Sequence, residues 1–182
     1  VMVFIDFENF NIAVMSYYRS IGEPYPRLDY NKVPQEIVKL IPGGNELVKT
    51  FLCAPKPDDF LAQDERRAGT YRWINGLKNQ PYFTVIEGRH VARPVSGQTF
   101  STMDISDPTT YYVEEKGTDI NMGTHILAKG FLNAYDSAVI VSGDTDYMPV
   151  LDVLNTIGKI AVCVGVKGQN MVKLKTHSDD II

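Results

Sequence analysis

Residues 137–164 read SAVIVSGDTDYMPVLDVLNTIGKIAVCV, and this stretch decides the fold class. Two runs within it, Ser137–Val141 and Ile160–Val164, are apolar along nearly their whole length, as strands are when both faces are covered. Between them, residues 147–157 carry apolar side chains at helical spacing and are followed by Gly158, a residue type that commonly ends helices. A strand, a helix and a second buried strand in this order predict a parallel sheet with helices packed against it.

The same alternation extends over the rest of the chain. Further strands are expected at residues 1–5, 46–53 and 82–87. Helices are expected after Asn9 or Asn11 and at residues 31–41, 58–79, 118–133 and 169–175. We therefore predict an α/β protein, a three-layer α/β/α sandwich with a mostly parallel central sheet, formed as a single domain over residues 1–182. Between residues 88 and 112 the pattern weakens, and a hairpin or an excursion from the main sheet is expected there.

Composition limits the class of protein and its location. With 44% hydrophobic and 22% charged residues among 182, the chain has an ordinary globular composition. Its apolar runs are too short for a membrane span, so no membrane partner is expected. Cys53 and Cys163 lie far apart in apolar runs and match no metal or redox spacing. We interpret them as buried thiols in a reducing compartment, which predicts a cytoplasmic protein.

Charge is unevenly distributed along the chain. The net charge of −4 argues against a general nucleic-acid-coating protein. Residues 49–93, however, carry 8 Lys and Arg against 5 Asp and Glu, whereas residues 104–152 carry 2 against 9. A basic segment beside an acidic one suits a polyanionic substrate held near a carboxylate metal site, although two solvated faces would give the same counts.

Carboxylates follow the predicted strands at the edge where parallel α/β sheets form their sites. Asp6 follows the first strand, Asp144 and Asp146 follow the strand at 137–141, and Asp119 opens the predicted helix at 118–133. A single Asp before a helix is an ordinary N-cap, but capping does not explain two acids two positions apart. Converging carboxylates raise one another's pKa, and a divalent cation removes the repulsion. Oxygen donors alone favour Mg²⁺ or Mn²⁺ over zinc.

Other common sites are not indicated by the sequence. There is no P-loop spacing, no G-x-G-x-x-G after a strand and no G-x-S-x-G elbow, which argues against a nucleotide-cofactor enzyme and an α/β-hydrolase. The three histidines, His90, His125 and His177, have no mutual spacing of a metal or triad set. We interpret them as incidental.

Four short motifs occur in a particular order along the chain: FIDFEN at residues 4–9, KGTD at 116–119, SGDTDYMPV at 142–150 and SDDI at 178–181. Together they resemble the motifs of NYN domains, the LabA-like branch of the PIN-type nuclease superfamily. The third is the most specific, because it matches the pattern S-G-D-x-D-[FY]-x-P-[LV]. The fourth departs from the family's A-D-x-F, with Ser for Ala and Ile for Phe.

The resemblance implies a PIN-like fold and a ribonuclease site that depends on Mg²⁺ or Mn²⁺. It assigns the catalytic and metal-binding cluster to Asp6, Asp119, Asp144 and Asp146. Asn9 would be the polar residue beside this cluster and Ser142 would orient the Asp144 loop, while Asp179 would be a weaker member. Residues 88–112 match no part of the core family that we can align, and they could reshape the substrate groove or extend a homodimer surface.

The expected partner is single-stranded RNA. Arg66, Arg67 and Arg72, in the basic segment, are candidate substrate-binding residues. Residues 66–73, RRAGTYRW, alternate basic and aromatic side chains as in a platform for single strands. Tyr71 also fits the apolar stripe of the predicted helix, which would place it in the core instead, and the position of Trp73 is left open.

Two other functions remain open from the sequence. A non-catalytic RNA-binding or regulatory module would keep the basic surface and tolerate loss of Asp144. A HAD-like phosphatase also has an Asp after its first strand, but its chemistry needs D-x-D there, and position 8 is Glu. It also needs its later acids to be four positions apart, whereas Asp144 and Asp146 are two apart.

Overall fold

A single seven-stranded sheet organises the chain in the computed structural model, which describes residues 1–43 and 45–182. The strands are β1 (Met2–Asp6), β2 (Lys49–Pro57), β3 (Phe83–Pro94), β4 (Tyr111–Lys116), β5 (Ser137–Val141), β6 (Ile160–Val164) and β7 (Asp180–Ile181). Their order across the sheet is β4-β3-β2-β1-β5-β6-β7. Neighbours pair in parallel except β3 and β4, which are antiparallel.

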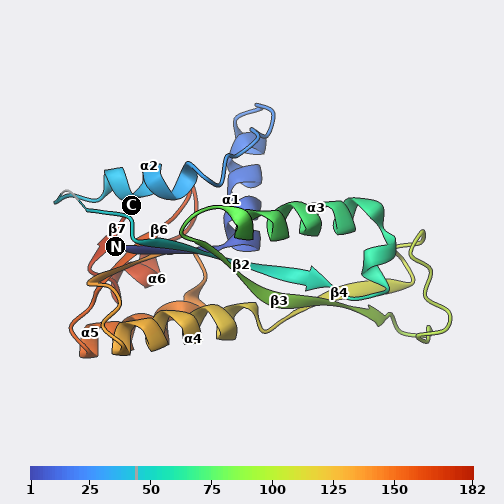
Figure 1. Cartoon of the computed structure of the whole chain (residues 1–182). Coiled ribbons are helices and arrows are strands. Elements are labelled where there is room, and N and C mark those ends of the chain that lie inside the picture. The colour runs from blue at the N-terminus through green and yellow to red at the C-terminus, as the bar shows by residue number, and fades with distance from the viewer. Residues whose placement is uncertain (44) are drawn as a thin grey trace.

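Helices cover both faces of this sheet (Figure 1). They are α1 (Phe7–Ser20), α2 (Val33–Leu40), α3 (Glu65–Gly76), α4 (Thr118–Phe131), α5 (Met148–Thr156) and α6 (Val172–Lys175), with 3₁₀ turns η1 (Leu61–Gln63), η2 (Leu77–Asn79) and η3 (Thr145–Tyr147). Figure 1 shows α2 and α3 on one face and α4 and α5 on the other. This arrangement confirms the predicted α/β/α sandwich with a mostly parallel sheet.

Side chains along β1 point alternately to the two faces of the sheet, so the strand contributes to both hydrophobic cores. Val3 and Ile5 point toward one face and pack in the core that includes Ile37 of α2 and Ile74 of α3. Phe4 points to the opposite face, where it joins the core that α4, α5 and α6 complete. All three β1 side chains are fully buried. A central parallel strand covered on both faces explains why residues 1–5 are uniformly apolar.

The helix predicted over residues 58–79 is interrupted. Asp58 accepts hydrogen bonds from the backbone N–H of Leu61 (2.8 Å) and of Ala92 in β3 (2.8 Å), which ties this segment to the sheet. Asp64 then has an extended backbone and caps α3 by accepting from the N–H of Arg66 at 2.9 Å. The predicted helix is therefore divided into η1, α3 and η2, with Asp64 as the side-chain cap at the start of α3.

The strand predicted at residues 82–87 is twice as long, because β3 continues to Pro94. Its first part pairs with β2 and its last part with β4, where His90 lies opposite Glu115. Residues 88–112 thus comprise the second half of β3, a connecting loop and the start of β4. The antiparallel pair stays in the main sheet and forms one of its edges (Figure 1).

Two further expectations about the chain can be compared with the structure. Cys53 and Cys163 are both buried and free. Among the described residues, no helix combines the length and the apolar character needed to cross a membrane.

Candidate functional site

Three carboxylates converge at the carboxyl ends of the central strands. Asp119 is the second residue of α4, and Asp144 and Asp146 lie directly after β5. Each offers an oxygen, and these oxygens lie within 4.8 Å of one another. Asp144 also caps η3, because its Oδ1 accepts from the backbone N–H of Asp146 at 3.0 Å. The group opens onto a cleft of about 700 Å³ between α4 and residues 145–150.

Asp6 lies behind this group of three. Only 4% of it is exposed, and its oxygens accept hydrogen bonds from the backbone N–H of Asn9 (3.1 Å), from Ser142 Oγ (3.2 Å) and from the Tyr147 hydroxyl (3.4 Å). The same hydroxyl lies 3.0 Å from Asp119 Oδ1. Since a hydroxyl has one hydrogen, Tyr147 links the two carboxylates but satisfies only one at a time.

Among the described residues, no Lys, Arg or His forms an ion pair with these four acids. Burial raises the pKa of Asp6 to about 6; the Asn9 N–H and the Ser142 hydroxyl oppose this, and the negative charges of Asp119 and Asp144 add to it. Burial also raises the pKa of Asp119, and the charges of Asp144 and Asp146 contribute. A cation among these acids would relieve both the desolvation and the repulsion.

Asn9 and Ser142 shape the loop that carries Asp144. Asn9 Oδ1 accepts from the backbone N–H of Gly143 and from Gln169 Nε2, both at 2.9 Å. Ser142 Oγ accepts from the backbone N–H of Asp144 at 3.1 Å. A Cβ on Gly143 would lie 2.2 Å from Gln169 Nε2, so a larger residue at this position would displace the Gln169 side chain. Asn9 therefore holds the loop, and its carbonyl oxygen is fully engaged in doing so.

Comparison with known proteins identifies the family of the chain that carries this acidic site. The NYN domain family model matches residues 1–182. The chain belongs to the NYN domain family. NYN domains are part of the PIN-like nuclease superfamily, which supports a nuclease role. The fold also resembles the crystal structure of a protein of unknown function from Vibrio parahaemolyticus, with a TM-score of 0.60 and 15% identity over 100% of this chain and 90% of that one. A search of the curated proteins gave no match.

A second titratable group lies beside the acids of this NYN domain. Glu8, His90 and Glu115 offer ligand atoms within 4.8 Å of one another, and His90 Nε2 is 3.2 Å from Glu8 Oε1. Burial raises the pKa of Glu115 to about 7, and the charges of Glu8 and Asp6 add to this effect. His90, which we interpreted from the sequence as incidental, lies in this group. Its position becomes evident only from the register of β3 against β4.

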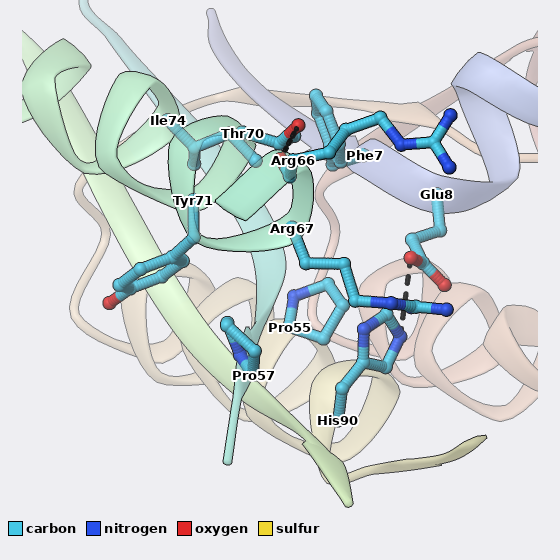
Figure 2. Close-up of a pocket in the computed structure, with 10 residues that line it drawn as sticks. All are labelled: Phe7, Glu8, Pro55, Pro57, Arg66, Arg67, Thr70, Tyr71, Ile74 and His90. Atoms are coloured by element: carbon cyan, nitrogen blue, oxygen red, sulfur yellow. Dashed lines mark hydrogen bonds and ion pairs between the residues drawn. The ribbon is translucent and has the colours of Figure 1, made fainter. Parts of the chain in front are cut away.

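The predicted substrate-binding arginines of the NYN domain separate into two groups. Arg66 and Arg67 line a cavity of about 160 Å³ together with Glu8 and His90, and Figure 2 shows both guanidinium groups reaching toward the Glu8 side. Arg67 Nε lies 3.4 Å from Asp64 Oδ2, whereas Arg66 forms no ion pair within residues 1–43 and 45–182. Arg72 instead pairs with Glu65, outside the cavity lining.

Asp179 is placed away from the other acids. Its Oδ2 accepts from the backbone N–H of Ala161 at 2.7 Å, at the beginning of β6. The acidic group lies at the opposite, carboxyl ends of the strands. Asp179 therefore closes the β6–β7 pairing of the NYN domain, and the expectation that it is a weaker member of the cluster is wrong for this structural reason.

The raised pKa of Asp6 predicts a pH dependence of stability in the metal-free NYN domain. An acid whose pKa rises from an ordinary 3.8 to about 6 on folding binds more protons in the native state between these values. The free energy of unfolding should therefore fall as pH increases through this window, by at most about 3 kcal/mol from this residue. Urea unfolding in EDTA at several pH values measures the slope.

The variant Asp6→Asn should lose most of this slope and keep the part due to other acids such as Glu115. Asp59→Asn is the matched control, since Asp59 is exposed. A slope in Asp6→Asn equal to that of the wild type would show that the Asp6 carboxyl is not the group that holds the proton.

Proposed function

We propose that this NYN domain is a Mg²⁺- or Mn²⁺-dependent ribonuclease that hydrolyses phosphodiester bonds in single-stranded RNA. The observation that carries the proposal is the convergence of Asp119, Asp144 and Asp146 within 4.8 Å. The donors in this group are carboxylate oxygens only, which suit a hard divalent cation. Burial raises the pKa of Asp119, and the charges of Asp144 and Asp146 raise it further, which favours a cation at this position. When bound, such an ion would orient a phosphate, activate a water molecule and neutralise charge on the leaving oxygen.

The surrounding residues would keep these carboxylates in place. The Tyr147 hydroxyl fixes one oxygen of Asp119, and Ser142 connects the Asp144 backbone to the buried Asp6 carboxylate. Gln169 and Asn9 hold the turn at Gly143. In this proposal Asp6 acts through Tyr147 and Ser142 as a positioning residue, because its own oxygens are buried and hydrogen-bonded.

The RNA would be held by the basic cavity next to the acidic group. Glu8 lines that cavity and follows Asp6 by two residues, so a strand that reaches the acids passes near Arg66 and Arg67. Arg66 has an exposed side chain and is free to contact a phosphate. The two buried free cysteines suit a reducing compartment, and we infer a cytoplasmic location.

Three substrates distinguish this proposal from the other functions. We expect the protein with Mn²⁺ to shorten end-labelled single-stranded RNA and to leave p-nitrophenyl phosphate intact. Turnover of p-nitrophenyl phosphate without RNA cleavage would instead indicate a phosphatase. RNA that is retained on the protein but never cut would indicate a binding module, and cleavage of single-stranded DNA alone would correct the substrate class.

The role of Arg66 predicts a change in the salt dependence of binding. If Arg66 contacts one phosphate, Arg66→Gln should weaken RNA binding and reduce the slope of log K against log salt by about 0.7. Arg72→Gln is the matched control, because Arg72 is paired with Glu65 outside the cavity. Titrations in EDTA at four salt concentrations measure both variants. Equal slopes for Arg66→Gln and the wild type would assign Arg66 to ordinary solvated surface.

A further inference from the structure

A groove with aromatic walls continues from the Arg66 cavity along α1. It encloses about 550 Å³ and shares Phe7, Glu8 and Thr70 with that cavity. Trp73 of α3 forms one wall, and Tyr25 and Tyr30 from the segment after α1 form another. We call this feature the aromatic groove. Two of the shared residues, Phe7 and Glu8, directly follow Asp6 in the chain.

The floor of the aromatic groove is a face of α1 that carries two exposed apolar side chains. Glu8, Asn11, Ile12 and Met15 follow the spacing i, i+3, i+4, i+7, which places them on one side of α1. Ile12 is 56% exposed and Met15 is 43% exposed. Ile12 and Met15 are open to solvent, so this part of the helix suits a flat, partly apolar group.

The aromatic rings are held in place and still open to solvent. Trp73 meets Tyr30 in a T-shaped contact with ring centroids 5.7 Å apart, and meets Phe7 at 6.2 Å. It nevertheless keeps 42% of its surface exposed, and Tyr25 keeps 44%. A ring that is already ordered can accept a stacked group with little further loss of conformational entropy.

Asn11 and Arg27 offer hydrogen-bond donors to the aromatic groove, and Glu8 is the acid in its lining. Asn11 Oδ1 accepts from the hydroxyl groups of Tyr25 (2.7 Å) and Tyr30 (3.0 Å). This orients the Asn11 amide, and no acceptor for its NH₂ is found in the described parts of the chain. Arg27 is exposed and forms no ion pair with any described residue. The groove therefore suits a ligand whose acceptor atoms face Asn11 and whose negative charge lies at Arg27, away from the Glu8 end that the Arg66 cavity shares.

We propose that the aromatic groove binds an unpaired nucleobase of the RNA strand, stacked against Trp73, with the neighbouring phosphate at Arg66 or Arg27. The inference rests on the proposed function for the identity of the strand. A nucleobase combines the required properties, namely a flat face for the rings, acceptors for Asn11 and an attached phosphate for the guanidinium groups. An apolar peptide would leave both arginines without a partner, and bases within a duplex are not accessible to such a groove.

The protein contains its own reporter, since Trp73 is its only tryptophan. In EDTA, where no cleavage is expected, titration with a short oligoadenylate RNA should quench Trp73 fluorescence to saturation. An abasic sugar-phosphate oligomer of equal length should quench it little. Anisotropy of labelled oligoadenylate should show that Trp73→Ala weakens binding by about 5- to 100-fold, while Trp73→Phe stays within about fivefold of the wild type. Tyr82→Ala, which removes a 77% exposed aromatic elsewhere, is the control.

The outcomes separate this inference from the proposed function. In Asp144→Asn the quenching should persist although cleavage is lost. If the wild type cuts RNA but shows no quenching, and folded Trp73→Ala binds as tightly as the wild type, the groove inference is overturned alone. If quenching occurs but the wild type cuts no RNA with any divalent cation, the nuclease proposal fails and the base site stands. Equal quenching by the abasic oligomer would overturn the base site, since only phosphate contacts would then remain.

Discussion

Asp144→Asn should reduce the single-turnover rate of RNA cleavage in Mn²⁺ by about three orders of magnitude. One oxygen of Asp144 caps η3, but the carboxylate also belongs to the group of three acids. Asparagine is nearly as good a cap as aspartate, so the turn should survive the substitution. What is lost is a charged metal ligand, and the cation that it helps to hold is worth several kcal/mol to the reaction.

The same variant should be at least as stable as the wild type without metal, because it removes one of several repelling charges. Thermal unfolding in EDTA measures this, and it excludes misfolding as the cause of lost activity. Asp59→Asn provides a matched loss of one exposed carboxylate and should cleave RNA normally. Wild-type activity in Asp144→Asn would reduce Asp144 to a helix cap and overturn the mechanism.

Gly88→Ala should impair both folding stability and activity. A Cβ at this buried position of β3 would lie 2.0 Å from Thr118 Oγ1 and 3.0 Å from the Thr118 Cα atom. The strand and the start of α4 must then separate, which costs about 1–3 kcal/mol. Because Asp119 follows Thr118 directly, the displacement also moves a proposed metal ligand, and we expect at least a tenfold loss of cleavage rate.

Two variants control the Gly88→Ala experiment. Gly76→Ala places a methyl group at the end of α3, where there is nothing within 4 Å. The free energy of unfolding should therefore stay unchanged or increase slightly. Gly88→Ala combined with Thr118→Ala removes the hydroxyl oxygen that makes the shortest contact, and should recover part of the lost stability. If Gly88→Ala unfolds at the same urea concentration as the wild type, the close contact between position 88 and Thr118 is contradicted.

The fold and the main acids were accessible from the sequence for a physical reason. A buried parallel strand is apolar on both faces, so β1, β5 and β6 are conspicuous, and polar residues that follow them lie at one edge of the sheet. This is why Asp144 and Asp146 could be placed together. The interruption of the predicted 58–79 helix could not be foreseen, because Asp58 accepts a hydrogen bond from the backbone N–H of Ala92 in β3, which is distant in the sequence.

The sequence analysis did not predict features that depend on the register of paired strands or on how deeply a side chain is buried. The antiparallel pairing of β3 with β4 brings His90 opposite Glu115, and Glu8 reaches them from α1, which local periodicity does not encode. The sequence also gave no indication that Gln169 would reach back to Asn9 across the sheet edge. Likewise, Asp6 looks equivalent to the other acids in the sequence, and only three-dimensional packing reveals that it lies behind Tyr147.

The most direct test of the central claim is the rate of single-stranded RNA cleavage by the wild-type protein as a function of Mn²⁺ concentration, with EDTA as the zero point. If the three converging carboxylates hold a catalytic cation, the rate should rise with Mn²⁺, saturate, fall to background in EDTA and return when Mn²⁺ is added in excess. Equal cleavage in EDTA, or no cleavage by folded protein at any Mn²⁺ or Mg²⁺ concentration, would contradict the claim.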